Sequence, residues 1–297
     1  MRYRKKKRFF FIKQNHLRVI VGIGIVLVVA AIVFFILSVT SHQTSKQNAV
    51  DKVAALGLVN VGLRGDLNKL CTYNEETGMF EGFEKDLSDE LVNRLFGDAV
   101  IKYDVNVNTE TRTAYLKRGD VDFALGAATY LKISGVAYSK PYFSDGSAFL
   151  VMEDKTKSMQ ALSGGVIGIV QGSMHAQEGN TKKDENATLM SDYLKKLEIE
   201  ASVKIFASYP EAIDALRNGF VDAVCASETA LTQFGRPGML MLPERFMPND
   251  YRVCIPTALG LFTEAVDDAL EGMKNDGTLE SLMKKWNLIN YSELAEQ

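Results

Sequence analysis

The feature that most constrains this chain is an uninterrupted apolar segment at residues 19–39, VIVGIGIVLVVAAIVFFILSV. At about 1.5 Å per residue, a helix of this length spans roughly 31 Å, which is the thickness of a bilayer's hydrocarbon core. Eight cations and no acid precede the segment: Arg2, Arg4, Lys5, Lys6, Lys7, Arg8, Lys13 and Arg18. This asymmetry predicts a cytoplasmic N-terminus and an extracellular remainder.

A cleaved signal peptide is the alternative interpretation of the same segment. The apolar core of a signal peptide usually runs about 7–15 residues and ends at small residues suited to cleavage. The segment here is longer, and Ser38 to Thr40 fits such a cleavage site poorly. We therefore expect residues 1–18 to be a cytoplasmic basic tail, residues 19–39 an uncleaved transmembrane anchor, and residues 40–55 a polar linker.

The charge of the chain divides at the same place. The whole chain carries −3 and the first eighteen residues carry +8, so residues 19–297 carry −3 − 8 = −11. An acidic extracellular part argues against nucleic acid or anionic lipid as its partner. The three cysteines, Cys71, Cys225 and Cys254, are too few for a disulfide scaffold, and we expect buried thiols although one bridge is possible.

After the linker, short β-rich runs alternate with amphipathic helices. This order predicts an α/β fold with parallel sheets covered by helices on both faces. The expected strands are residues 59–64, 100–107, 121–125, 149–152, 166–170, 203–206, 221–226 and 251–258. The expected helices are residues 83–96, 111–117, 191–197, 211–217, a short one from 228, 264–274 and 279–286. The polar residues 177–186 are expected to form a solvated loop or a frayed helix.

The strand–helix scheme occurs twice, which predicts two lobes. Lobe 1 is expected to comprise residues 56–147 and 255–297, and lobe 2 residues 148–254. Because lobe 1 is discontinuous in sequence, the chain crosses between the lobes twice. Two crossing strands predict a hinge.

Several segments, in order, resemble motifs of the bacterial extracellular solute-binding proteins of family 3. Residues 82–87 (GFEKDL) resemble that family's entry to its first helix, and residues 117–122 (KRGDVD) and 139–142 (SKPY) resemble its next two motifs. Residues 215–222 (ALRNGFVD) resemble the second-lobe motif, and residues 274–279 with Lys285-Trp286 resemble the family's ending. The resemblance covers residues 59–288 and implies a type II periplasmic-binding-protein-like fold with a hinge, closing on a small ligand.

The resemblance also implies a set of ligand-binding positions. Gly172 and Ser173 match a turn after the first strand of lobe 2, where Gly lets the backbone approach the ligand and Ser offers its N–H and hydroxyl to a carboxylate. The run that carries the family's carboxylate-binding Arg falls on Thr129 to Lys132, so Lys replaces Arg and loses its fork of donors. The family's amino-binding Asp falls on Ser227, beside Glu228, which either substitutes for it or is an N-terminal helix residue favoured by the dipole. A ligand-covering aromatic is replaced by Leu67.

Arg64 and Arg112 match positions at which family members that resemble glutamate and aspartate binders hold a side-chain carboxylate. Together with Lys132 they predict three cations in one cleft, which suits a ligand with two carboxylates. The alternatives are that Arg64 pairs with the nearby Asp66 and that Arg112 is a solvated surface residue. His175, a lone histidine in a polar loop, is interpreted as neither a metal ligand nor a pH sensor.

The favoured function is a membrane-tethered protein that captures a polar, acidic amino acid and delivers it to an ABC permease, without cofactor or metal. An anchored sensor or interaction module with a degenerate solute-binding fold is the alternative, because the Arg and Asp that hold an amino acid are both replaced. An enzyme ranks third. The fold resembles cyclohexadienyl dehydratases, but the chain shows no His–carboxylate constellation, metal-ligand cluster or nucleophile elbow.

Overall fold

The computed structural model describes residues 14–155, 157–177 and 188–293. The chain divides into two units, Met1–Asn48 and Ala49–Gln297. Most of the basic tail and most of the polar segment at residues 177–186 lie outside the described residues.

A single helix, α1 (Gln14–Ala54), contains the whole apolar segment. From Ile23 onward it is long and apolar enough to cross a membrane, a test that an N-terminal signal sequence also passes. The polar residues 40–54, which the sequence assigned to a linker of unstated conformation, continue this helix. They contain no Gly or Pro, and hydroxyls such as Thr44 Oγ1 donate to carbonyl groups one turn earlier. The helix ends where the N–H of Gly57, in the left-handed region at φ 69°, donates to the carbonyl of Ala54.

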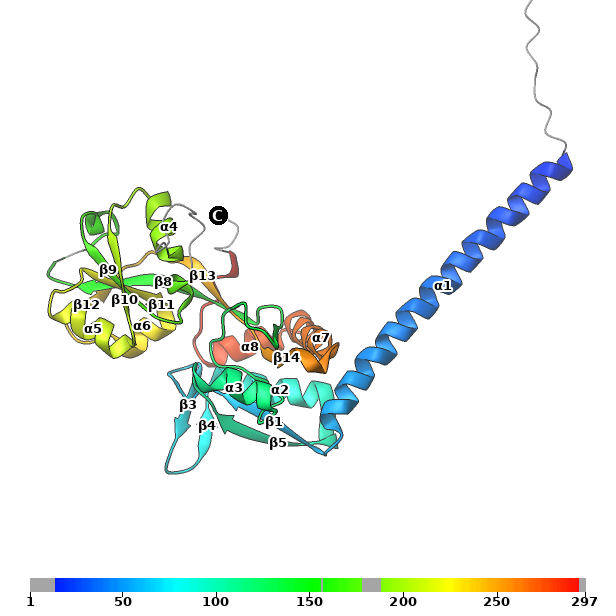
Figure 1. Cartoon of the computed structure of the whole chain (residues 1–297), viewed down its shortest axis with the longest axis horizontal. Helices are drawn as coiled ribbons and strands as arrows, with labels where there is room; N and C mark the ends of the chain where they lie inside the picture. Colours follow the sequence, from blue (N-terminus) through cyan, green and yellow to red (C-terminus); the bar gives the residue numbers. More distant parts are fainter. Residues whose placement is uncertain (1–13, 156, 178–187, 294–297) are drawn as a thin grey trace, which may run out of the picture. The chain divides into compact units, whose positions relative to one another are not determined.

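Lobe 1, as the structure shows it, is built on a five-stranded sheet in the order β5-β1-β6-β14-β7 (Figure 1). Its strands are β1 (Leu58–Leu63), β5 (Ile101–Asn106), β6 (Phe123–Ala124), β7 (Val136–Tyr138) and β14 (Cys254–Pro256). Its helices are α2 (Phe83–Phe96), α3 (Thr111–Arg118), α7 (Phe262–Asn275) and α8 (Thr278–Lys285). A small antiparallel sheet of β2 (Asp66–Leu67), β3 (Cys71–Asn74) and β4 (Met79–Glu81), which the sequence did not predict, follows β1.

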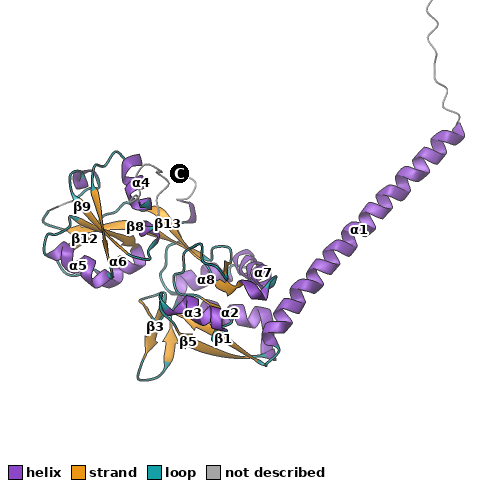
Figure 2. Cartoon of the chain, in the orientation of Figure 1, coloured by secondary structure: helices purple, strands orange, loops and turns teal. Residues whose placement is uncertain are grey.

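Lobe 2 is built on a six-stranded sheet, β10-β9-β11-β8-β12, with β13 also paired to β8 (Figure 2). Its strands are β8 (Phe143–Met152), β9 (Val166–Val170), β10 (Ser202–Phe206), β11 (Ala223–Ser227), β12 (Met239–Met241) and β13 (Phe246–Tyr251). Its helices are α4 (Leu189–Lys196), α5 (Tyr209–Arg217) and α6 (Glu228–Phe234). The sequence placed β9, β10, β11 and these helices within two residues of their observed bounds, but it found only the last four residues of β8 and predicted neither β12 nor most of β13.

Alternate residues of the central strand β11 pack on opposite faces of the lobe 2 sheet. Cys225 packs in the cluster that includes Met190 and Leu194 of α4, whereas Val224 packs with side chains of α5 and α6. Both faces are therefore covered by helices, which is why the central strands β9 (VIGIV) and β11 (AVCAS) are almost entirely apolar. In lobe 1 the main cluster also holds Val50 and Val53 from the end of α1.

The two lobes are joined by strands β8 and β13, which pair side by side. Asp145 lies opposite Asn249, and Phe143 opposite Tyr251. The sequence predicted one strand at residues 251–258, but the chain breaks at residues 252–253 between β13 and β14, which belong to different sheets. The C-terminal segment adds a further link, because Tyr291 N–H donates to the carbonyl of Ser144 at 2.8 Å.

Candidate functional site

A cleft of about 730 Å³ lies between the lobes, at the carboxyl ends of the central strands of both sheets. Lobe 1 contributes residues that follow β1, β5 and β6, and lobe 2 contributes residues that follow β9, β10 and β11. This is where open α/β sheets bind their ligands. The lobes meet at the rims of the cleft: Asn68 N–H donates to Gln233 Oε1 at 2.8 Å, and Gln177 Nε2 donates to the carbonyl of Tyr130 at 3.4 Å.

Arg64 follows β1 and lines the cleft as predicted, but it is already paired. Its Nε and Nη2 donate to the two carboxylate oxygens of Asp66 at 2.6 and 2.9 Å. Burial has the largest single effect on Arg64 and lowers its pKa, but the hydrogen bond to Asp66 and the negative charge of Asp66, with smaller contributions from Tyr209 and Glu84, together raise it. The alternative of a local ion pair, which the sequence had raised, is the arrangement that the structure contains.

Arg112 also lines the cleft, and its side chain is not a solvated surface group. It lies in the first turn of α3, where Asn108 Oδ1 accepts the N–H of Thr111 at 2.7 Å and so caps the helix. Arg112 is 8 % exposed, and its Nη1 donates to the carbonyl of Gly126 at 2.8 Å. Among the described residues, no carboxylate lies within ion-pair distance of its guanidinium.

Gly126 is required at its position because it lies between the two arginines. A Cβ there would stand 2.6 Å from Arg64 Cβ and 3.3 Å from Arg112 Nη1, and its φ of 116° disfavours any side chain. The next residue, Ala127, donates its N–H to Glu84 Oε1 at 2.7 Å, and Tyr142 donates its hydroxyl to the same oxygen. Burial raises the pKa of Glu84. Glu84 belongs to the GFEKDL motif, yet nothing in that motif indicates that its side chain supports the cleft loop at Ala127.

Thr129 lines the cleft, whereas Lys132 does not. A turn closed by Ile133 N–H and the carbonyl of Leu131, at 2.8 Å, places Leu131 in the lining and leaves Lys132 exposed. The sequence placed Lys132 by an ungapped count from Pro141, and such a count cannot detect this turn. The prediction that three cations line the cleft is therefore wrong for Lys132. Leu67, which replaces the expected aromatic residue, is in the lining.

Gly172 and Ser173 line the cleft from lobe 2. Gly172 has a φ of 77°, and a Cβ there would lie 4.0 Å from Thr109 of lobe 1. The N–H of Ser173 donates to the carbonyl of Val170 at 3.1 Å, so the turn itself uses the N–H that was expected to bind a carboxylate. The Ser173 hydroxyl is buried and has no partner among the described residues.

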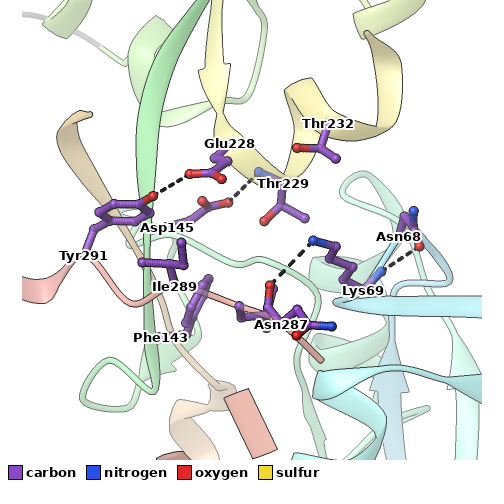
Figure 3. Close-up of a pocket in the computed structure, with 11 residues that line it drawn as sticks. Asn68, Lys69, Phe143, Asp145, Glu228, Thr229, Thr232, Asn287, Ile289 and Tyr291 are labelled. Atoms are coloured by element: carbon purple, nitrogen blue, oxygen red, sulfur yellow. Dashed lines mark hydrogen bonds between the residues drawn. The ribbon is translucent and has the colours of Figure 1, made fainter. Parts of the chain in front are cut away.

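Ser227 and Glu228, adjacent in sequence, lie in different places. Ser227 lines the cleft, and its hydroxyl caps α6 by accepting the N–H of Ala230. Glu228 lines a separate small pocket, where its Oε2 accepts hydrogen bonds from Arg245 Nε and from the Tyr291 hydroxyl, both at 2.7 Å. Figure 3 shows the bond to Tyr291. Burial would raise the pKa of Glu228, but these two bonds lower it. The expectation that Glu228 contacts the ligand does not fit this arrangement.

Several lining residues escaped the sequence analysis. Tyr209 stacks on Phe234 with ring centroids 5.0 Å apart and supplies aromatic surface from lobe 2. His175 and Asn249 are both in the lining and almost fully buried. They come from a short turn after β9 and from the crossing strand β13, and only the folded chain brings them together. Their sequence context gives no signal of this.

The three cysteines are buried, and the described residues form no cluster suited to a metal ion. Cys71, Cys225 and Cys254 are buried free thiols, and burial raises the pKa of each, which makes them unreactive. In the part of the chain that the structure describes, no group of His, Cys, Asp and Glu is arranged to hold a metal ion.

Comparisons with known proteins agree with this architecture. Residues 59–289 match the model of the bacterial extracellular solute-binding proteins, family 3. The chain is 25% identical over 256 residues to the glutamine-binding protein GlnH of an ABC transporter of Bacillus subtilis, covering 83% of this chain and 88% of that protein. It is 29% identical over 220 residues to a glutamine-binding protein of Geobacillus stearothermophilus, covering 72% and 78%.

Among solved structures, the amino acid ABC transporter substrate-binding protein AbpA of Streptococcus pneumoniae, bound to L-arginine, superposes with a TM-score of 0.60 at 18% identity. The match covers 80% of this chain and 97% of AbpA, and at this identity it speaks for the fold. The two-lobed type II fold that the sequence predicted is thereby confirmed. The chain belongs to the bacterial extracellular solute-binding proteins, family 3.

Proposed function

We propose that this protein is the membrane-tethered binding component of an ABC importer and that it captures an amino acid in the cleft between its lobes. Its relatives of this family include amino acid-binding proteins of ABC transporters, which supports the general role. The observation that carries the proposal for this chain is the state of Arg112. Arg112 has no ion pair among the described residues, and the charge of the buried Glu84 acts on it from a greater distance. A guanidinium buried in the cleft wall in this state is costly unless an anion joins it.

Arg112 is placed to hold a carboxylate of the ligand. Its Nη1 is fixed by the Gly126 carbonyl, which leaves the rest of the fork of donors for a second partner. A planar guanidinium binds a carboxylate through two parallel bonds, which sets the orientation of the ligand as well as its affinity. Arg112 thus takes over the role that the sequence assigned to Lys132.

The charged residues that line the cleft favour a ligand with a single carboxylate group. Asp66 neutralises Arg64, and Lys132 is outside the lining, so Arg112 is the described lining cation without an ion pair. We propose a polar neutral amino acid of the glutamine type, which the two glutamine-binding relatives support. Glutamate or aspartate, which the sequence favoured, would require Arg64 to leave Asp66 for the second carboxylate.

Calorimetry on the full chain in detergent micelles tests this proposal. Glutamine is expected to bind, and glutamate to bind more weakly. A ligand at one hundred times its dissociation constant also adds about 2.7 kcal/mol to the folded state, so a thermal-shift screen over all common amino acids reports any other choice. If glutamate binds more tightly than glutamine, the charge argument fails. If no amino acid binds, the transport role fails and the sensor or interaction module takes its place.

The tether is a separate part of the proposal. The apolar segment of α1 and its eight preceding cations support a single membrane crossing with the N-terminus in the cytoplasm and the cleft outside. We expect full-length protein in the membrane fraction, with the lobes digested by protease added to intact protoplasts. A soluble mature form that starts near Ser41 would show cleavage and contradict the anchor.

A further inference from the structure

The wall that lobe 2 presents to the cleft contains no charged side chain among its described residues. The four charged residues of the lining, Arg64, Asp66, Glu110 and Arg112, all belong to lobe 1. A ligand group that faces lobe 2 must therefore be recognised by neutral atoms. Two of the polar side chains on that wall, His175 and Asn249, are held by one serine.

That serine, Ser147 of β8, is fully buried and has three hydrogen-bond partners. Its Oγ lies 2.6 Å from the carbonyl of Met247, 2.8 Å from Asn249 Nδ2 and 2.8 Å from His175 Nε2. A hydroxyl has one hydrogen to donate and two lone pairs to accept with. Its partners must therefore divide into one acceptor and two donors.

Only one assignment of donors and acceptors satisfies Ser147 and its three partners. The Met247 carbonyl can only accept, so it takes the hydroxyl hydrogen of Ser147. The Asn249 amide nitrogen is also near the carbonyls of Met247 and Asp145, so it is the amide N–H that faces Ser147. The remaining lone pair of Ser147 must accept a hydrogen from His175, which places the ring proton on Nε2.

It follows that Nδ1 of His175 carries an unshared lone pair. This atom is buried and receives no hydrogen bond from any described residue, although the ring lines the cleft and is only 1 % exposed. Burial lowers the pKa of His175 to about 4, so the ring is neutral at pH 7.

The turn that carries His175 faces the charged wall. Gly172, three residues earlier, would place a Cβ 4.0 Å from Thr109, in the loop that precedes Arg112. Ser173, in the same turn, has the buried hydroxyl without a partner among the described residues. A ligand whose carboxylate is held by Arg112 therefore presents its other polar groups toward this turn.

We propose that His175 Nδ1 is a neutral acceptor that receives an N–H group of the bound ligand, and that it selects for ligands with such a donor. This inference rests on the proposed function, because it assumes that an amino acid occupies the cleft. The donor is either the α-ammonium group or a side-chain amide of the ligand. Analogues that lack one of these two groups distinguish between them.

Two variants separate Nδ1 from the rest of the ring. His175→Gln places an amide nitrogen near the position of Nε2, which keeps the donor to Ser147 and removes the acceptor. His175→Asn places an amide oxygen near the position of Nδ1. We expect His175→Gln in the full chain in micelles to bind glutamine at least tenfold more weakly than wild type, and His175→Asn to stay within about threefold. Equal melting temperatures of the free proteins serve as the folding control.

Two glutamine analogues identify the donor. The monoamide of glutaric acid lacks the α-ammonium group, and glutamate lacks the amide N–H. If Nδ1 receives the ammonium group, His175→Gln should not weaken the monoamide further; if it receives the amide, glutamate should be spared. An equal loss for all three ligands would mean that the substitution acts in another way, and would overturn the proposal.

Nitrogen NMR of histidine-labelled wild type tests the tautomer without any variant. We expect a protonated Nε2 and an unprotonated Nδ1 in the free protein, with a shift of the Nδ1 signal when glutamine is added. A proton on Nδ1, or glutamine binding by His175→Gln within twofold of wild type, overturns the inference while leaving amino acid binding intact. If wild type binds no amino acid, the proposed function itself has failed, and the inference with it.

Discussion

The two walls of the cleft differ in how they are built. The lobe 1 wall carries every charged residue of the described lining, with Arg64 and Asp66 in an ion pair and Arg112 fixed on a backbone carbonyl. The lobe 2 wall presents hydroxyls, an imidazole, three side-chain amides and the stacked rings of Tyr209 and Phe234.

This contrast suggests a division of tasks between the lobes. A charged wall attracts and orients an ionic ligand while the cleft is open and wet. A neutral wall then closes over the ligand without paying to strip water from further charges, since neutral polar groups lose much less hydration energy than ions.

Arg112→Ala removes the described lining cation that has no ion pair, and should weaken glutamine binding by about 2–5 kcal/mol, the range for truncating one partner of a buried charge pair. Lys132→Ala is the matched control, because Lys132 is exposed and outside the cleft lining. Calorimetry on both variants decides the point. A large loss with Lys132→Ala and none with Arg112→Ala would restore the assignment made from sequence.

Acidification should act on the neutral wall through His175. Its pKa is about 4 in the folded chain against an ordinary 6.5, so the unfolded chain takes up a proton first as the pH falls. The folded chain therefore keeps its full unfolding free energy above about pH 6.5. It loses about 3 kcal/mol of that free energy as the pH falls to about 4. Denaturant unfolding should therefore show the unfolding free energy of wild type, measured relative to that of His175→Gln, falling by that amount between pH 7 and pH 4. Parallel pH profiles would exclude a buried neutral ring.

Gln233→Ala should loosen the contact between the two walls. Gln233 of lobe 2 accepts the N–H of Asn68 and donates to the carbonyl of Asp66 in lobe 1. At about 0.5–1.5 kcal/mol for each of the two bonds, ligand affinity should fall by about 1–3 kcal/mol. Gln177→Ala, which removes one longer bond at the opposite rim, is the milder control.

Closure itself can be followed with spin labels at Met79 in lobe 1 and Phe220 in lobe 2, both exposed. Glutamine should narrow the distance distribution in wild type and should do so less in Gln233→Ala. Identical distributions with and without bound glutamine would rule out a hinge between the walls.

Glu228→Gln gives the smallest expected effect and tests a position that the sequence assigned to the ligand. Its carboxylate binds Arg245 and Tyr291 away from the cleft, in a partly exposed cluster. The expected cost is about 0.5–1 kcal/mol of unfolding free energy, with unchanged glutamine affinity. A loss of affinity at constant stability would place Glu228 in the binding site after all.

The sequence predicted the fold in detail because each lobe repeats a local pattern. The helix expected at residues 83–96 and the strand expected at residues 166–170 agree with the observed α2 and β9. Elements with few residues and little apolar periodicity were missed, such as the small sheet of β2, β3 and β4. The helical continuation of α1 through residues 40–54 was missed because a polar composition was taken as a sign of a linker.

The candidate site was predictable where it follows directly from a strand end or a motif. Arg64, Arg112, Thr129, Gly172, Ser173 and Ser227 all line the cleft. Lys132 and Glu228 do not, because a turn at Leu131 and an ion pair with Arg245 turn them elsewhere. Neither the turn at Leu131 nor the ion pair with Arg245 can be recognised in the sequence.

The sequence alone determined the apolar helix, the two-lobed α/β class and the position of most cleft loops, because these depend on local hydrophobic patterns and on turn residues at strand ends. Which charged side chains remain available to bind a ligand depends on the tertiary structure. Asp66 pairs with Arg64, Arg245 takes Glu228, and Ser147 fixes the proton of His175. The last two contacts join residues distant in sequence, and in all three hydrogen bonding depends on distances and angles that the fold alone sets.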